Sequence, residues 1–127
     1  MHVTLWVLQI ILGIYFMVLG VLHFIIPPNL PQPMTWFYDL SPLLHYFSGS
    51  AEILGSLGLI LPGLTKIQTR LTPLAGLGLA LLMIGAAGYH IIRGEFQNLP
   101  TNIVLFTISA YIAYGRWNKN PLPTSKS

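Results

Sequence analysis

Cysteine is absent from this sequence of 127 residues, and charged side chains make up only 7% of it. The absence of thiols excludes intrachain disulfides, thiol redox chemistry and cysteine-ligated metal clusters. Acidic residues are also scarce, because three Asp and Glu stand against six Lys and Arg. Hydrophobic residues account for 54% of the chain, which is far outside the usual composition of a soluble domain. The composition therefore predicts an integral membrane protein in contact with a lipid bilayer.

Four long apolar runs are separated by short polar or proline-rich breaks. Each run is close to the roughly 20 residues that an α-helix needs to cross a hydrocarbon core about 30 Å thick. We expect helices at about residues 3–26, 43–63, 72–92 and 99–117. The predicted fold is an all-α membrane protein, a four-transmembrane-helix bundle that forms one domain over residues 1–117. A polar tail is expected over residues 118–127.

Prolines mark the expected helix ends. Pro27 and Pro28 are expected to end the first helix, because proline lacks an amide donor and restricts the residue before it. Ser41 followed by Pro42 is typical of an N-cap and a first helical position, and so predicts the start of the second helix. Between these two helices, the stretch MTWFYDL predicts a short interfacial segment at the level of the lipid headgroups.

Basic residues are distributed unevenly between the two sides of the predicted bundle. One side holds Lys66, Arg70, Arg116, Lys119 and Lys126. The other side holds only Arg93. Because cytoplasmic loops carry an excess of Lys and Arg, we expect both termini to be cytoplasmic. Membrane topology thus accounts for these charges, and they do not indicate a nucleic-acid partner.

Small residues recur at helical spacing along each run. Lipid provides no hydrophobic drive for helix association, so close packing across small residues has to hold such a bundle together. We expect the inward-facing packing positions to be Gly13, Gly20, Gly55, Ser56, Gly76, Ala80 and Ala87.

Ionisable residues converge on the outer half of the predicted bundle. The candidate ligand-binding or proton-sharing residues are Glu52, His23, His90, Asn102 and His45. A charged carboxylate within hydrocarbon costs several kcal/mol, so Glu52 is expected to face the interior and to be neutral or to share a proton with His23 or His90. Two interpretations stay open: a polar bridge between helices, or a functional site. No metal-ligand spacing such as HxxxH lies within one helix, which argues against a metal site and disfavours haem.

Three segments carry a resemblance to a known family. The stretches SGSAEILGSLGLILPG and AGLGLALLMIGAAGYHIIRGE, with a last run entered through NLPTN, resemble the DoxX-like family of small four-helix membrane proteins. Glu52, Gly55 and Gly58 match the family's pattern in the second helix, and His90 with the following Arg93-Gly94-Glu95 matches the exit of the third. The resemblance implies a prokaryotic cytoplasmic (inner) membrane protein. It also implies a link to quinone-associated redox complexes, cofactor maturation or assembly.

Three functional hypotheses follow. The first is an accessory or binding protein whose intramembrane polar pocket, open to the outside, holds a quinone-like or lipid-like hydrophobic small molecule. The second is a membrane subunit of a quinone-linked redox complex, which would need a redox protein partner to supply its electron carrier. The third is an assembly or chaperone factor for a membrane protein partner. The sequence contains no phosphate-binding loop or hydrolase motif, and it leaves open whether the protein catalyses a reaction.

Overall fold

The computed structural model describes residues 2–26, 28–30, 36–119 and 121–123. Its four long helices are α1 (His2–Ile25), α3 (Pro42–Thr65), α4 (Leu71–Ile92) and α5 (Leu99–Tyr114). The short elements are α2 (Trp36–Asp39), the 3-10 helix η2 (Phe96–Asn98) and the π-helix η3 (Gly115–Lys119). Over these residues the chain is helical with no strand, which confirms the predicted all-α class.

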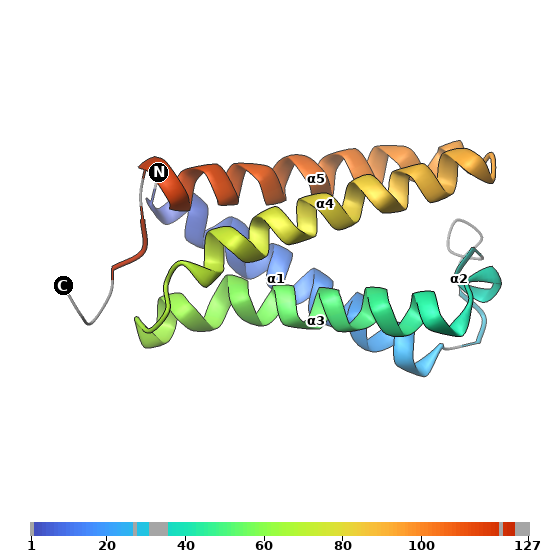
Figure 1. The fold of residues 1–127 in the computed structure, drawn as a ribbon, viewed down its shortest axis with the longest axis horizontal. Helices are drawn as coiled ribbons and strands as arrows, with labels where there is room; N and C mark the ends of the chain where they lie inside the picture. The colour runs from blue at the N-terminus through green and yellow to red at the C-terminus, as the bar shows by residue number, and fades with distance from the viewer. Residues whose placement is uncertain (1, 27, 31–35, 120, 124–127) are drawn as a thin grey trace.

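The long helices form two antiparallel pairs. Helix α1 packs along α3, and α4 packs along α5. In Figure 1 the α4 and α5 pair lies in one layer and the α1 and α3 pair in the other, and the two layers diverge toward the end that carries α2. The start of α1 and the end of α5 lie together at the opposite end. The α2 end is therefore where a space between the pairs can be lined from both layers.

Three helices of the described part, α1, α3 and α4, are long and apolar enough to cross a membrane, judged by length and composition. Helix α5 is shorter, with 16 residues, but η3 continues it directly. Large apolar side chains are exposed along all four long helices, as contact with acyl chains requires. The chain thus forms a membrane helical bundle, whereas the predicted count of four spans stays a prediction.

The ends of α3 follow from its local chemistry. Its first turn is capped by Ser41, whose side-chain oxygen accepts a hydrogen bond from the amide of Leu44 at 3.3 Å. The helix runs two residues past the expected end at 63, because Pro62 is accommodated within the last turns. Proline has no N–H to donate to the carbonyl of Gly58, and the Thr72 hydroxyl of α4 donates to that oxygen instead, at 2.7 Å. A contact between helices thus replaces the missing bond within α3.

Some predicted features fall on residues outside the described ranges. These are Pro27, the first two residues of the interfacial segment MTWFYDL, and residues 120 and 124–127 of the tail. The described remainder of that segment contains α2, and the described part of the tail contains the buried side chain of Leu122, which lies close to Gly63.

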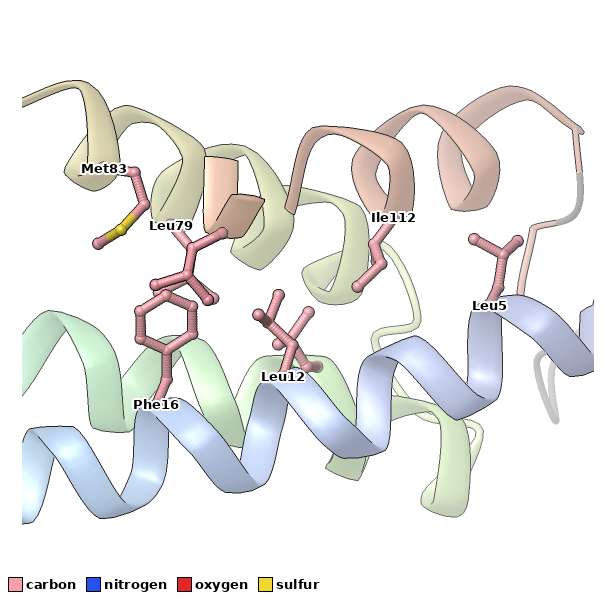
Figure 2. Close-up of a cluster of buried hydrophobic side chains, with 8 residues drawn as sticks. Leu5, Leu12, Phe16, Leu79, Met83 and Ile112 are labelled. Atoms are coloured by element: carbon pink, nitrogen blue, oxygen red, sulfur yellow. The ribbon is translucent and has the colours of Figure 1, made fainter. Parts of the chain in front are cut away.

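The apolar core joins the two layers away from the α2 end. It consists of Leu5, Leu12, Phe16, Leu59, Leu79, Met83, Leu105 and Ile112. Figure 2 shows side chains of α1 pointing toward those of α4 and α5, with Phe16 directed at Leu79. This core holds the pairs together beside the region where they diverge.

A close backbone approach sets the crossing of α1 and α3. A Cβ atom added to Gly20 would lie 3.0 Å from the carbonyl oxygen of Gly49, and one added to Gly49 would lie 2.9 Å from that of Gly20. Gly20 was among the expected packing positions, but Gly49 was not. Glycine on both helices allows this approach, in keeping with small-residue packing in membranes.

Arg116 connects the chain at the end opposite α2. Its side chain is only 2% exposed, and its Nε donates to Oε1 of Gln9 at 2.6 Å. Its Nη1 donates to Nδ1 of His2 at 2.9 Å, while the amide of Gln9 donates to the Leu59 carbonyl at 2.7 Å. The sequence interpretation treated Arg116 as one of several topological charges, whereas in the structure it ties η3 to α1 and, through Gln9, to α3.

The Gly49 contact generates a stability prediction. Gly49→Val should lower the free energy of unfolding by about 1–3 kcal/mol, because the Gly20 carbonyl cannot rotate away from the added side chain. Gly88 is the matched control, because no atom lies within 4 Å of an added Cβ there. Thermal unfolding in mild detergent, followed by circular dichroism, checks this. Equal midpoints for Gly49→Val and Gly88→Val would contradict the tight crossing.

Candidate functional site

A cavity of about 660 Å³ lies between the two helix pairs. It is lined by residues of α1 and α3 from one layer and of α4, η2 and α5 from the other, with Trp36 of α2 at its edge. Its volume falls in the range of small-molecule sites. Most lining residues are Leu, Ala, Gly and aromatic residues. The cavity is thus a mostly apolar space between the two helix pairs.

Four of the five candidate ligand residues line this cavity. They are His23 on α1, Glu52 on α3, His90 on α4 and Asn102 on α5. The fifth, His45, is buried but does not line the cavity. The helical periodicity of the sequence was sufficient to nominate these residues, since each lies on the inward face of its helix.

His45 and His23 form a hydrogen-bonded chain with a defined direction. The Nε2 atom of His45 lies 2.8 Å from the carbonyl oxygen of Phe37, and a carbonyl can only accept, so this nitrogen carries a proton. The Nδ1 atoms of His45 and His23 lie 2.9 Å apart. With a neutral His45 its Nδ1 is the acceptor, and His23 therefore donates from Nδ1.

Glu52 stands at the inner end of this chain. Its Oε1 lies 3.2 Å from Nε2 of His23, and the two side chains are only 4% and 2% exposed. The distance suits a shared proton, and the carboxyl group keeps capacity for a further hydrogen bond. Because His23 donates from Nδ1, one mobile proton remains between its Nε2 and Glu52. Keeping that proton on Glu52 leaves every member of the chain uncharged, which a hydrocarbon environment favours.

Aromatic rings of α2 cover the two histidines. Phe37 is fully buried and stacks on His23 with ring centroids 4.5 Å apart. It also meets His45 edge-on at 4.9 Å. On the other side, Trp36 meets His90 edge-on at 4.8 Å. The short helix therefore closes the α2 end over both layers.

A second polar cluster holds α2 to the end of α4. Arg93 donates from Nη2 to Asp39 at 2.7 Å and from Nε to Glu95 at 3.1 Å. The Nδ1 atom of His90 lies 2.9 Å from the other carboxylate oxygen of Glu95. Of the two histidines considered for Glu52, the structure therefore brings His23 to it and places His90 with Glu95.

Electrostatics in this cluster follow from those contacts. The hydrogen bond from the Arg93 guanidinium holds the pKa of the Glu95 carboxyl below its ordinary value, with a further contribution from His90. The same contact with Glu95, followed by the bond to Asp39, raises the pKa of Arg93. Both shifts favour the charged forms, so the cluster is ionic at neutral pH.

Sequence reasoning missed several residues at this end. Asp39 was not paired with Arg93, because the two residues lie far apart in the sequence and their contact depends on how α2 folds back. Asn98 was considered only as the start of the last helix, although it also lines the cavity. Tyr15 was not nominated and contributes to the same wall as His23. Its position one residue before the inward-facing Phe16 gave no signal.

The described residues contain no group of three His, Asp or Glu side chains placed to hold a metal ion. His23, His45 and Glu52 instead face one another in a row through single contacts. The arrangement can hold one proton between Glu52 and His23, and it can present a neutral polar group to a molecule in the cavity.

The direction of the chain gives a spectroscopic prediction. Nitrogen NMR of histidine-labelled protein should show His45 protonated on Nε2 and His23 protonated on Nδ1. Infrared spectra should contain the carbonyl band of a protonated carboxylic acid, and this band should vanish in Glu52→Gln. A His45 ring protonated on Nδ1 alone would contradict the direction derived from the Phe37 carbonyl.

The second cluster gives a prediction about pH. Because the pKa of Glu95 is lower in the folded protein than in the unfolded chain, the carboxylate stabilises the fold above the ordinary glutamate pKa of about 4.3. This stabilisation should disappear as the pH falls through the lower folded value. Thermal midpoints measured down this range should therefore fall more steeply for wild type than for Glu95→Gln. Parallel profiles would mean that Glu95 makes no net ionic contribution.

Comparison with known proteins adds one finding. The model of the DoxX-like family matches residues 7–112, a stretch that begins in α1 and ends in α5. No curated protein and no solved structure matches the chain.

Proposed function

The chain belongs to the DoxX-like family of membrane proteins, and we propose that it is an accessory or binding protein for a quinone-like or lipid-like molecule. The ligand occupies the cavity between the two helix pairs and contacts Glu52. In this proposal α5 and η3 together form the fourth span of a single transmembrane domain. Both termini are cytoplasmic, in a prokaryotic cytoplasmic membrane, and the α2 end faces outside.

One observation carries the proposal: a buried carboxyl group lines a mostly apolar cavity of about 660 Å³. A helix bridge alone would need Glu52 to be satisfied by its neighbours. In the described part of the chain the partner found for it is His23, 3.2 Å from Oε1, which leaves the carboxyl with capacity for a further hydrogen bond. A polar group of a molecule bound beside this carboxyl could form that further hydrogen bond.

The surroundings of Glu52 support an amphiphilic ligand. Leucines of both layers, among them Leu44, Leu81 and Leu105, line the cavity and suit an apolar body. The polar head would lie at Glu52 and His23. The hydrogen-bonded chain behind His23 keeps this pair neutral overall, so head-group recognition relies on hydrogen bonding rather than on net charge.

The hydrogen-bonded chain also favours a second candidate function, that of a membrane subunit in a quinone-linked redox complex. The proton that Glu52 and His23 share could be transferred to a reduced quinone-like ligand, and Glu52 would then be reprotonated by water that enters the cavity. The electrons would come from a redox protein partner. Stimulated quinone turnover with such a partner, lost in Glu52→Gln, would distinguish this function from simple binding.

The proposed function predicts that Glu52→Gln loses the ligand and keeps the fold. Protein purified in mild detergent is analysed by native mass spectrometry, lipid extraction and absorption spectroscopy. Loss of the hydrogen bond between the neutral carboxyl group and the ligand should weaken binding roughly tenfold or more. Glu95→Gln is the matched control, since it makes the same chemical change outside the cavity lining.

The outcomes separate the functional hypotheses. A stoichiometric molecule present in wild type and Glu95→Gln but depleted in Glu52→Gln supports a ligand site at Glu52. If the molecule is bound to the same extent in all three proteins, the proposed ligand site at Glu52 is wrong. A defined membrane protein that copurifies equally with all three, in the absence of a small molecule, would instead favour an assembly role.

A further inference from the structure

We infer that the side-chain amides of Asn98 and Asn102 form a second polar anchor of the cavity, which selects a neutral ligand with an acceptor oxygen directed at this wall. This inference rests on the proposed binding function and deepens it, because it specifies the chemical class of the ligand's head.

The two amides are built into the wall opposite Glu52. Asn98 is the last residue of η2 and Asn102 lies four residues later in α5, so the two share a helix face. Both line the cavity, whereas Glu52 lines it from α3 in the other layer. The two walls therefore present polar groups from opposite helix pairs.

Both amides carry unused donors. The Nδ2 atoms of Asn98 and Asn102 are buried, and neither has a hydrogen-bond partner within the described residues. Asn102 as a whole is only 8% exposed. Donors buried without a partner are unfavourable in a folded protein, and more so in a membrane, where water does not compensate for them. Neither Nδ2 atom is accessible to a water-sized molecule, so each amide would have to rotate about its side-chain bonds to donate to a ligand oxygen in the cavity.

Charge along the cavity excludes an anionic head. Among the residues that the structure describes, no Lys or Arg lines it. Glu52 and His23 share one proton and are neutral as a pair, as described above. Arg93 lies outside the lining and is engaged by Asp39 and Glu95, and His90 pairs with the same Glu95. A phosphate or carboxylate in the cavity would thus be desolvated without a free counter-charge, which is strongly unfavourable.

The ligand class follows from these two walls. Its head is uncharged and carries at least two oxygen functions, one that hydrogen-bonds with Glu52 and a carbonyl, ester or ether oxygen that accepts from Asn98 and Asn102. Its body is apolar. Neutral amphiphiles such as 1-oleoylglycerol and a decyl-substituted benzoquinone both fit this description and serve as probes.

The test compares Asn102→Leu with Ser109→Ala. Leucine has the same branched shape and the same number of side-chain heavy atoms as asparagine, although it is larger, and it removes the donors. Ser109 is a matched control, because it is a buried residue of the same helix whose hydroxyl also lacks a partner in the described part, yet it does not line the cavity. Binding of each neutral probe to full-length protein in nanodiscs is titrated through the fluorescence of Trp36, which lines the cavity, with a Trp36→Phe protein as the signal control.

We expect Asn102→Leu to weaken binding of at least one neutral probe about fivefold to tenfold, while Ser109→Ala stays near wild type. Ligand-free Asn102→Leu should unfold at the same temperature as wild type or higher, because an unsatisfied donor has been replaced by an apolar group. A purely structural asparagine would instead lower that midpoint. Dioleoylphosphatidic acid, which carries a charged phosphate head, should not compete.

The results that would contradict the second anchor differ from those that would contradict the proposed function. If Glu52→Gln loses the probe while Asn102→Leu binds as wild type, the second anchor is wrong and the proposed function survives. If neither substitution changes the affinity for the probe, both the second anchor and the proposed function are wrong. Tighter binding of phosphatidic acid than of either neutral probe, or no saturable binding of both neutral probes to wild type, overturns the assignment of a neutral ligand.

Discussion

The structure depends on how a carboxyl group is kept within an apolar bundle. Glu52 lies away from water, and the hydrogen-bond direction imposed by the Phe37 carbonyl leaves one proton between Glu52 and His23. That proton makes the group neutral, which removes most of the cost of burying it. Two features at the same end serve this requirement. His23 of α1 and His45 of α3 lie next to each other, and the buried ring of Phe37 contacts both.

Meeting that requirement shapes the rest of the fold. The close approach of Gly20 and Gly49 brings α1 against α3, so that His23 reaches both His45 and Glu52. The apolar core and the network around Arg116 fasten the two layers further along the bundle. With the layers held there, their divergence at the α2 end leaves a cavity lined by polar groups from both sides. The position of the cavity is thus a consequence of where the helices are tied together.

The two polar clusters at the α2 end differ in physical character. The chain around Glu52 is buried and neutral, so its strength comes from desolvated hydrogen bonds. The cluster of Arg93, Glu95 and Asp39 is ionic and partly exposed, so salt and pH can weaken it. Because α2 contacts both clusters, its position over the cavity combines a stable apolar contact through Phe37 with an adjustable ionic one through Asp39.

The sequence by itself determined the all-helical class, the membrane setting and most of the inward face, because these depend on composition and on a period of 3.6 residues that is local to each helix. The same period nominated Glu52, His23, His90 and Asn102, all of which line the cavity. Only the tertiary structure decided which side chains these four residues contact. The pairing of Glu52 with His23 and of His90 with Glu95 depends on the offset and crossing of separate helices, which no local pattern encodes. The same reason accounts for Gly49, Asp39 and Arg116, whose roles arise from contacts between residues far apart in the chain.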